Sequence, residues 1–210
     1  IENKNSQWAN AMTTDGSMWV WIPRFEYKIT QRTGDTTTAG TIDVKIIPKT
    51  QTVADSGYII HPVFTNDSSN NYDKGGWDKE LSGIWIAKYK TSGSVAAPVS
   101  KPNASVLRST YTTNNMYTSS LSYNTAINSH LLKNSEWGAI AYFSHSQYGR
   151  NGFEIKTTTT PATSGAGGND TSTTGNLYGI FDLVTNEYEY VSAGYTGYAK
   201  ISGSTAITGS

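Results

Sequence analysis

The sequence predicts a single α+β domain, and three observations support this fold class. Its first half contains short segments in which apolar and polar residues alternate, the pattern of half-buried strands. A later segment around Trp137 repeats apolar residues at helical spacing instead. Aromatic residues make up 12% of the chain, with six Trp and fourteen Tyr, and this content favours an ordered core over disorder. We therefore expect residues 1–210, a length that fits one domain, to form one folded unit.

The composition excludes several classes of function. The chain has 16 basic and 16 acidic residues and no net charge, so it lacks the basic footprint of a nucleic-acid binder. It has no Cys, which removes thiol chemistry and thiolate metal sites. No apolar run approaches the roughly 20 residues that span a bilayer, so we expect no membrane span in this chain. It starts at Ile1 rather than Met, so we expect a segment upstream. It ends at Ser210 in a Gly/Ser/Thr tail, so we expect either a further segment downstream or a sheet that closes without one.

Four segments of the first half are predicted strands. Residues 18–22 form a compact apolar run that Pro23 ends, because proline cannot donate to a strand ladder. Residues 25–29 alternate and predict a half-buried strand. The same alternation recurs at 41–48, and an apolar strand follows at 83–89.

Two helices are expected in the middle of the chain. Apolar residues near helical spacing predict a first helix over 120–132, with Ser122 as a candidate N-cap. A second helix is predicted over 135–145, with Asn134 as its N-cap. Its Trp137 should share a core with the strand at 18–22. Between these elements the segments 92–118 and 147–173 are low in charge and rich in Ser, Thr, Asn and Gly, and we expect long surface loops there.

The segment TGNLYGIFDLVTNEYEYV, residues 174–191, is the one around which the other segments are expected to pack. Gly and Asn at its start are turn formers, and Gly179 allows close approach of the backbone. A short apolar run follows, then a second turn signal at Thr185-Asn186. Residues 187–191 alternate again and predict a strand.

The residues of this segment resemble the motif N-x-[FY]-G-L-[YW]-D-M-x-G-N-x-W-E-W of the formylglycine-generating-enzyme family, also called the sulfatase-modifying-factor domain. Here the motif runs from Asn176 to Tyr190, with Thr185 in place of a Gly and Tyr188 and Tyr190 in place of the paired Trp. The strand at 83–89 and the helix around Trp137 resemble two further family segments. The resemblance implies a C-type-lectin-like fold, with two short helices packed on small antiparallel sheets and many loops.

Three segments also look like parts of Firmicute prophage tail proteins and bacterial surface or pilin-like proteins: WVWIPR[FY]-x-Y-x-I, KNSEWGA-x-AY and TGN-x-YGI-x-D. That resemblance implies an extracellular binding or display module, on a virion or cell surface, for host-receptor recognition or surface attachment. The implied partner is a cell-surface glycan or protein receptor, and the implied assembly is a homo-oligomer. Two alternatives remain open: a structural subunit of an extracellular filament or virion, and a degenerate enzyme of the sulfatase-modifying-factor type.

No catalytic residue is predicted. The family forms formylglycine with Cys residues that hold copper, and this chain has none, so we expect no such enzyme activity. A related sulfoxide-synthase branch holds iron with three His. The three here, His61, His130 and His145, lack the H-x-x-x-H spacing that places two ligands on one helix turn. Glu187 and Glu189 share a strand face and could serve glycoside hydrolysis, but solvated or hydrogen-bonded carboxylates are the favoured interpretation.

Two pairs of residues are candidates for binding. The resemblance implies a calcium ion near Asn186 and Glu189, whose oxygens suit that metal. In the alternative interpretation, Asn186 only forms the turn and Glu189 bonds neighbouring amides; otherwise no cofactor is expected. Tyr195 and Tyr198 are the preferred ligand contacts, because tyrosine on a loop presents a large, rigid surface at small entropic cost. The alternative is that both pack into the edge of the domain.

Overall fold

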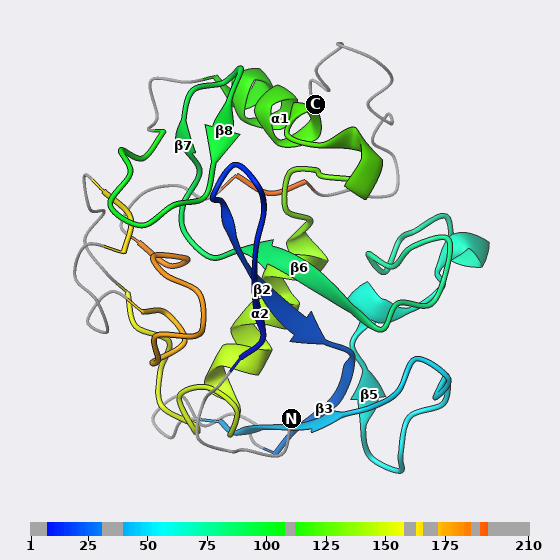
Figure 1. Cartoon of the computed structure of the whole chain (residues 1–210). Coiled ribbons are helices and arrows are strands. Elements are labelled where there is room, and N and C mark those ends of the chain that lie inside the picture. The colour runs from blue at the N-terminus through cyan, green and yellow to red at the C-terminus, as the bar shows by residue number, and fades with distance from the viewer. Residues whose placement is uncertain are drawn as a thin grey trace.

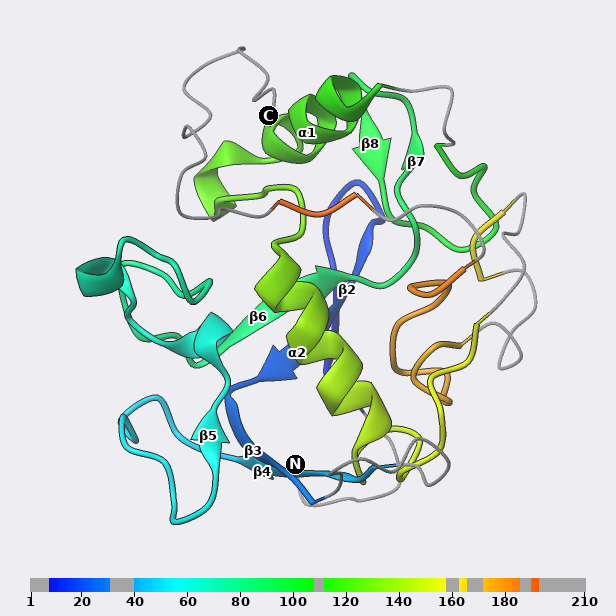
Figure 2. The same cartoon turned by 180° about the vertical axis from the view of Figure 1, so that it is seen from behind.

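The computed structural model describes residues 8–30, 40–107, 112–157, 163–165, 172–185 and 190–192. Within these ranges the chain forms two α-helices and three small antiparallel sheets, joined by long connections (Figures 1 and 2). The predicted α+β class is therefore confirmed. Three short 3-10 helices complete the described elements: η1 (Pro62–Phe64), η2 (Ser68–Asn70) and η3 (Thr125–Ile127).

The first sheet places β2 (Met18–Pro23) between β1 (Asn10–Met12) and β6 (Gly83–Ala87). Both pairings are antiparallel. The strands predicted at 18–22 and 83–89 are thus present, and Pro23 is the last residue of β2 as expected. Helix α2 (Asn134–His145) lies across the face of β2 and β6 that is turned to the viewer in Figure 2.

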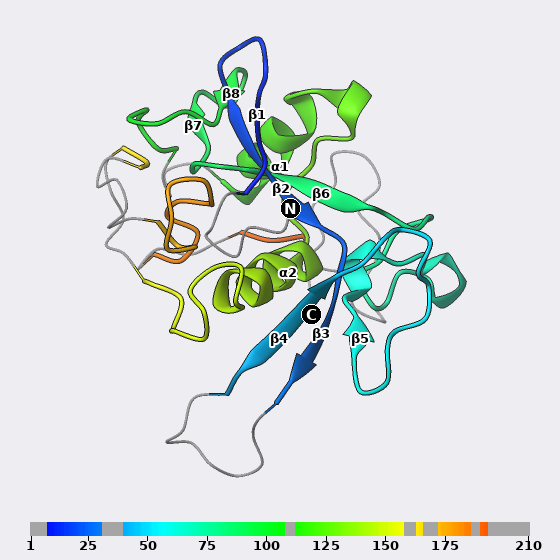
Figure 3. The same cartoon turned by 60° about the horizontal axis from the view of Figure 1, so that its bottom comes forward.

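The second sheet places β3 (Phe25–Ile29) between β4 (Ile42–Ile46) and β5 (Ile59–Ile60), again antiparallel. The predicted strands at 25–29 and 41–48 correspond to β3 and β4. Figure 3 shows that α2 lies in the angle between this sheet and the first one. The helix can therefore bury its apolar side against both sheets.

One residue, Arg24, separates β2 from β3, so a single bent strand belongs to both sheets. Its N–H donates to the carbonyl of Ser82, and its carbonyl accepts from the N–H of Ile47. The fully buried guanidinium forms an ion pair with Glu80 at 2.7 Å. It also donates to three backbone carbonyl oxygens, those of Gln51, Phe64 and Leu81. These partners compensate the burial of the charge and fix the corner between the sheets.

The segment 92–118, expected as one surface loop, contains regular structure. Strands β7 (Ser92–Gly93) and β8 (Pro98–Val99) pair in a third sheet, and α1 begins at Thr113. The side chain of Thr112 starts this helix, because its hydroxyl accepts from the N–H of Asn115 at 3.2 Å. The composition of this segment predicted a loop, but Thr112 caps the start of a helix within it.

The helix predicted over 120–132 is wrong in position. The observed α1 spans Thr113–Ser122, so Ser122 is its last residue and not its N-cap. Beyond it, the side chain of Asn124 accepts from the N–H of Ala126, and Asn128 takes a left-handed conformation with φ 55°. Both features favour a turn over a continued helix.

Helix α2 agrees with the prediction to within one residue. It starts at Asn134, and Lys133 rather than Asn134 is the N-cap. Glu136 reaches back to accept the N–H of Lys133 at 2.7 Å, which satisfies one of the free donors at the helix start. With 12 residues, α2 is the longest helix of the described ranges, and none of these helices could cross a bilayer.

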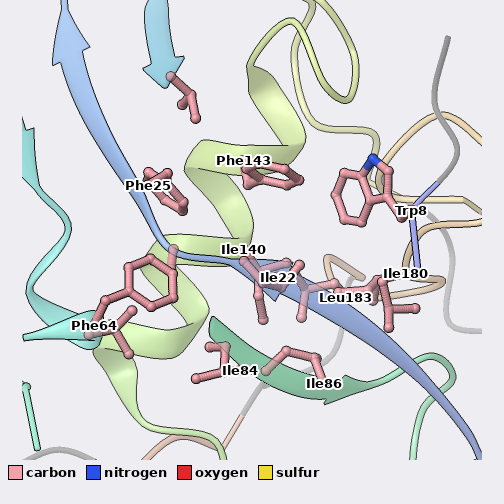
Figure 4. Packing of buried hydrophobic residues seen from close by; sticks show 14 residues of the cluster. Trp8, Ile22, Phe25, Phe64, Ile84, Ile86, Ile140, Phe143, Ile180 and Leu183 are labelled. Carbon is pink, nitrogen blue, oxygen red and sulfur yellow. The ribbon is translucent and has the colours of Figure 1, made fainter. Parts of the chain in front are cut away.

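One hydrophobic core joins the two sheets, α2 and the segment around residue 180 (Figure 4). It combines inward side chains of β2, β3, β4 and β6 with the apolar side of α2. Trp137 packs against this core while partly exposed, so the predicted contact between its helix and the strand at 18–22 is present. The buried members are Trp8, Val20, Ile22, Phe25, Val44, Val63, Phe64, Ile84, Ile86, Ala139, Ile140, Phe143, Ile180 and Leu183.

Candidate binding surface

Several residues singled out from the sequence lie outside the described part of the chain. They are Asn186 and Glu189, the candidate calcium ligands, Glu187, the second carboxylate, and Tyr195 and Tyr198, the candidate ligand contacts. Their roles stay predictions. The structure does place the three histidines, the start of the 174–191 segment and all three strands of the first sheet.

His61 is a core residue. Its ring is 6% exposed and lies among the aromatic rings of four neighbours: Phe25, Tyr27, Phe64 and Tyr142. Burial lowers its pKa from 6.5 to about 4, so the imidazole is neutral near pH 7. Such an environment stabilises a packed, uncharged ring.

His130 has a different environment, with an acceptor at each ring nitrogen. Nδ1 lies 2.6 Å from the carbonyl oxygen of Asn128, and Nε2 lies 3.1 Å from both carboxylate oxygens of Glu136. Burial by itself would lower the pKa of His130, but the hydrogen bond and charge of Glu136, helped by Asn128, raise it overall. A protonated ring can donate at both nitrogens, so this site favours the charged form.

The third histidine, His145, bonds the carbonyl oxygen of Gly40 through Nε2 at 3.2 Å. The three rings thus have three separate sets of partners. Among the described residues, no group of three His, Asp or Glu side chains could hold a metal ion.

The described part of the 174–191 segment is a turn held by its own side chains. The hydroxyl of Ser172 donates to the carbonyl of Asn176 at 2.6 Å, and Thr174 Oγ1 accepts from the N–H of Ile180 at 3.2 Å. Gly179 is required here, because a Cβ at that position would lie 1.7 Å from Thr174 Oγ1. Side chains therefore replace the regular ladder that this short turn lacks.

Two buried charged groups join this turn to the rest of the domain. The carboxylate of Asp182 accepts from the Ser164 hydroxyl at 2.9 Å and the Gly165 N–H at 2.8 Å. Lys88 Nζ, on the chain just after β6, donates to the carbonyl of Leu177 at 2.7 Å and to Asn10 Oδ1 at 2.5 Å. Burial lowers the pKa of Lys88. These contacts tie loops to strands, and their geometry is that of structural groups.

The first sheet presents two chemically different faces. Its inward positions, Val20 and Ile22 in β2 with Ile84 and Ile86 in β6, belong to the core. Its outward positions come from the alternate residues of the three strands, and none of them is charged. They are Ala11, Trp19, Trp21, Pro23, Gly83, Trp85 and Ala87, of which Pro23 is itself buried. Figure 1 is seen from this side, opposite the face that α2 covers in Figure 2.

Trp21 and Trp85, which we call the indole pair, are opposite each other in the strand register. Their ring centroids are 5.2 Å apart with a tilt of 54°. Trp85 is 48% exposed and Trp21 is half-buried. The Trp21 ring lies across Gly83, where a Cβ would be 2.3 Å from its Cζ2 atom. The Trp21 ring therefore covers part of the β6 backbone.

At the Trp19 end of the outward face, other side chains pack against the sheet. The Trp19 ring contacts the Tyr123 ring at a centroid distance of 5.1 Å, and its indole N–H donates to Thr13 Oγ1 at 3.2 Å. Asp15 supports this end by accepting from Thr13, Ser17 and Tyr123. These hydrogen bonds outweigh slight burial and lower the pKa of Asp15 to about 2. By contrast, the indole N–H groups of Trp21 and Trp85 donate to no partner among the described residues.

The indole pair is not among the binding residues predicted from the sequence. The signal was present in two strands, because Trp19 and Trp21 alternate with Val20 and Ile22, and Trp85 alternates with Ile84 and Ile86. When every position of a strand is apolar, periodicity does not tell which face the helix covers. The packing of α2 in the structure shows which face of the sheet is buried.

No family model matches this sequence, and no curated protein matches it.

Proposed function

We propose that this chain is a non-enzymatic extracellular module that binds a surface receptor, and that its fold is of the C-type-lectin-like type. The observation that carries the binding proposal is the indole pair on the face of the first sheet opposite α2, where Trp85 is 48% exposed. Exposed aromatic side chains grouped on one face are typical of interaction sites, because they gain most from leaving water. The fold proposal rests on the arrangement of two helices with small antiparallel sheets and on the motif order in the sequence.

The backbone beneath the indole pair suits recognition. Both rings project from hydrogen-bonded strands whose opposite face is part of the core. A ring on such a support loses little conformational freedom when it binds, so more of its contact energy remains as affinity. The buried ionisable groups Lys88, Asp182 and Glu136 hold loops and helix ends in place, which fits a binding role better than a catalytic one.

Attachment of the purified, labelled protein to intact host cells tests this function. We expect Trp85→Thr to weaken attachment, because it removes the more exposed ring while keeping a residue that favours strands. The matched control is Phe153→Thr, which removes a ring that is 72% exposed on a different part of the chain. Equal attachment by wild type and Trp85→Thr would refute the proposed site. In that case Tyr195→Ser and Tyr198→Ser test the other predicted binding site, the two tyrosines singled out from the sequence.

A further inference from the structure

We infer that the indole pair binds the ring of an uncharged sugar, an inference that rests on the proposed binding function. Its first support is the absence of charge at the outward strand positions, which are Ala, Gly, Pro and Trp. A cationic or anionic ligand gains affinity from an opposite charge beside it, and this face offers none at these positions. A neutral ligand matches it better.

The size of the face is the second support. The three strands provide seven outward positions, and Trp19 at one end already packs on Tyr123. A standard protein interface needs roughly 20–30 residues on each side. The indole pair with its small neighbours therefore fits one or two small rings better than a second copy of the chain.

The shape of the face is the third support. The neighbours of the indole pair along the strands include Gly83 and Ala87, whose side chains are too short to rise around the rings. Wholly apolar ligands prefer concave sites that enclose most of their surface. A ligand that lies on the exposed Trp85 ring beside such short neighbours keeps its other side in water, so it should be apolar on one side and polar on the other.

A pyranose ring meets these requirements. Its ring C–H bonds form an apolar side that can lie on the negatively polarised face of an indole, while its hydroxyls point outward to water. The N–H groups of Trp21 and Trp85 add two donors with no partner in the described part of the chain, and sugar hydroxyl oxygens can accept from them.

Nuclear magnetic resonance of the ¹⁵N-labelled protein tests this inference, because each indole N–H gives its own signal. The probes are β-1,4-linked hexasaccharides of glucose, N-acetylglucosamine and galactose, each added to about 10 mM, which detects a Kd near about 1 mM. We expect at least one to shift the signals of Trp21 and Trp85 in a saturable way, with a smaller effect on the hydrogen-bonded N–H of Trp19. Trp85→Thr should weaken the binding by at least about fivefold, the effect of losing one stacked ring. Phe153→Thr should leave it unchanged.

Several results would overturn the inference. One is no saturable shift with any of the three sugars, and another is a shift that Trp85→Thr does not affect. A third is a shift caused by a hexa-arginine peptide but by no sugar, which would mean a cation site. Indole signals that change with protein concentration alone would mean a contact between copies. If no sugar binds while Trp85→Thr still weakens attachment to cells, the ligand class is wrong and the proposed binding function stands.

Discussion

The two faces of the first sheet are built from the same strands and both carry apolar residues, yet they differ in burial. On the inner face, Val20 and Ile22 are fully buried beneath α2. On the outer face, Trp21 is half-buried and Trp85 is 48% exposed. Burial of apolar area does not by itself explain the difference, because an indole ring also gains free energy when it leaves water.

The comparison shows that folding explains the buried apolar residues of the inner face but does not explain the exposed ring of the outer face. Burial of the inner side chains contributes to folding, about 1.5–3 kcal/mol for each large one. The outer rings contribute much less of this term because water still reaches them. The exposed Trp85 ring gains the least from folding, which is why the proposed binding site is centred on it.

The largest effect is expected on the inner face. Ile22→Ala should lower the free energy of unfolding by about 2–5 kcal/mol, because it removes buried methyl groups and leaves a cavity. Urea unfolding followed by tryptophan fluorescence measures this change. A loss below about 1 kcal/mol would mean that α2 does not pack on this face as described.

Two histidines, the buried His61 and the partly exposed His130, make the stability of the domain depend on pH in opposite directions. The folded pKa of His61 is about 4 against 6.5 for a free histidine, so the unfolded chain binds the extra proton between these values. Stability should therefore fall as pH drops from 6.5 to 4, by about 3 kcal/mol for the full shift.

His130 acts on the alkaline side. Its folded pKa is raised, so its contribution is fully present below the unfolded pKa of 6.5 and is lost as pH rises through the folded value. The charges that face it are Glu136, which stabilises the imidazolium, and Lys133, which opposes it. Maximal stability is expected near pH 6.5. His130→Gln should flatten the decline above that pH while the decline below it, due to His61, remains as the internal control. Thermal unfolding between pH 4 and 8 measures both.

A smaller effect is expected in the turn that brings Ile180 and Leu183 to the core. Thr174→Val keeps the shape of the side chain but removes the acceptor of the Ile180 N–H. A buried donor left without a partner costs about 1–3 kcal/mol. Thr52→Val, at an exposed loop position, is the control for the substitution itself. Equal stability of the two variants would show that the turn is held by packing and not by its side-chain hydrogen bonds.

Patterns of neighbouring residues in the sequence were enough to predict several strands and the second helix. The strands at 18–22 and 25–29 were found from the positions of apolar residues, and α2 was found from helical spacing. The position of α1 was missed because it depends on one hydroxyl, that of Thr112, in a segment rich in such residues. Composition alone does not distinguish a capping threonine from a loop threonine.

The candidate site could not be predicted for a different reason. Its residues come from strands about 60 positions apart, since Trp21 and Trp85 meet only through the register of β2 and β6. The burial of Arg24 was also hidden, because its partners, the carbonyls of Gln51, Phe64 and Leu81, are distant in sequence. An alternating strand indicates two faces, and only the tertiary structure shows which face is covered and by what.

The smallest effect is expected on the outer face, and it separates the two members of the indole pair. Trp85→Thr should change the free energy of unfolding by about 1 kcal/mol or less, the value of one aromatic contact at an exposed position. Trp21→Thr should cost more, because that ring is half-buried and covers the backbone at Gly83. Thermal unfolding of the two variants beside wild type measures the difference. If Trp85→Thr destabilised the protein as strongly as Ile22→Ala, the outer ring would belong to the folded core and could not serve as a free binding surface.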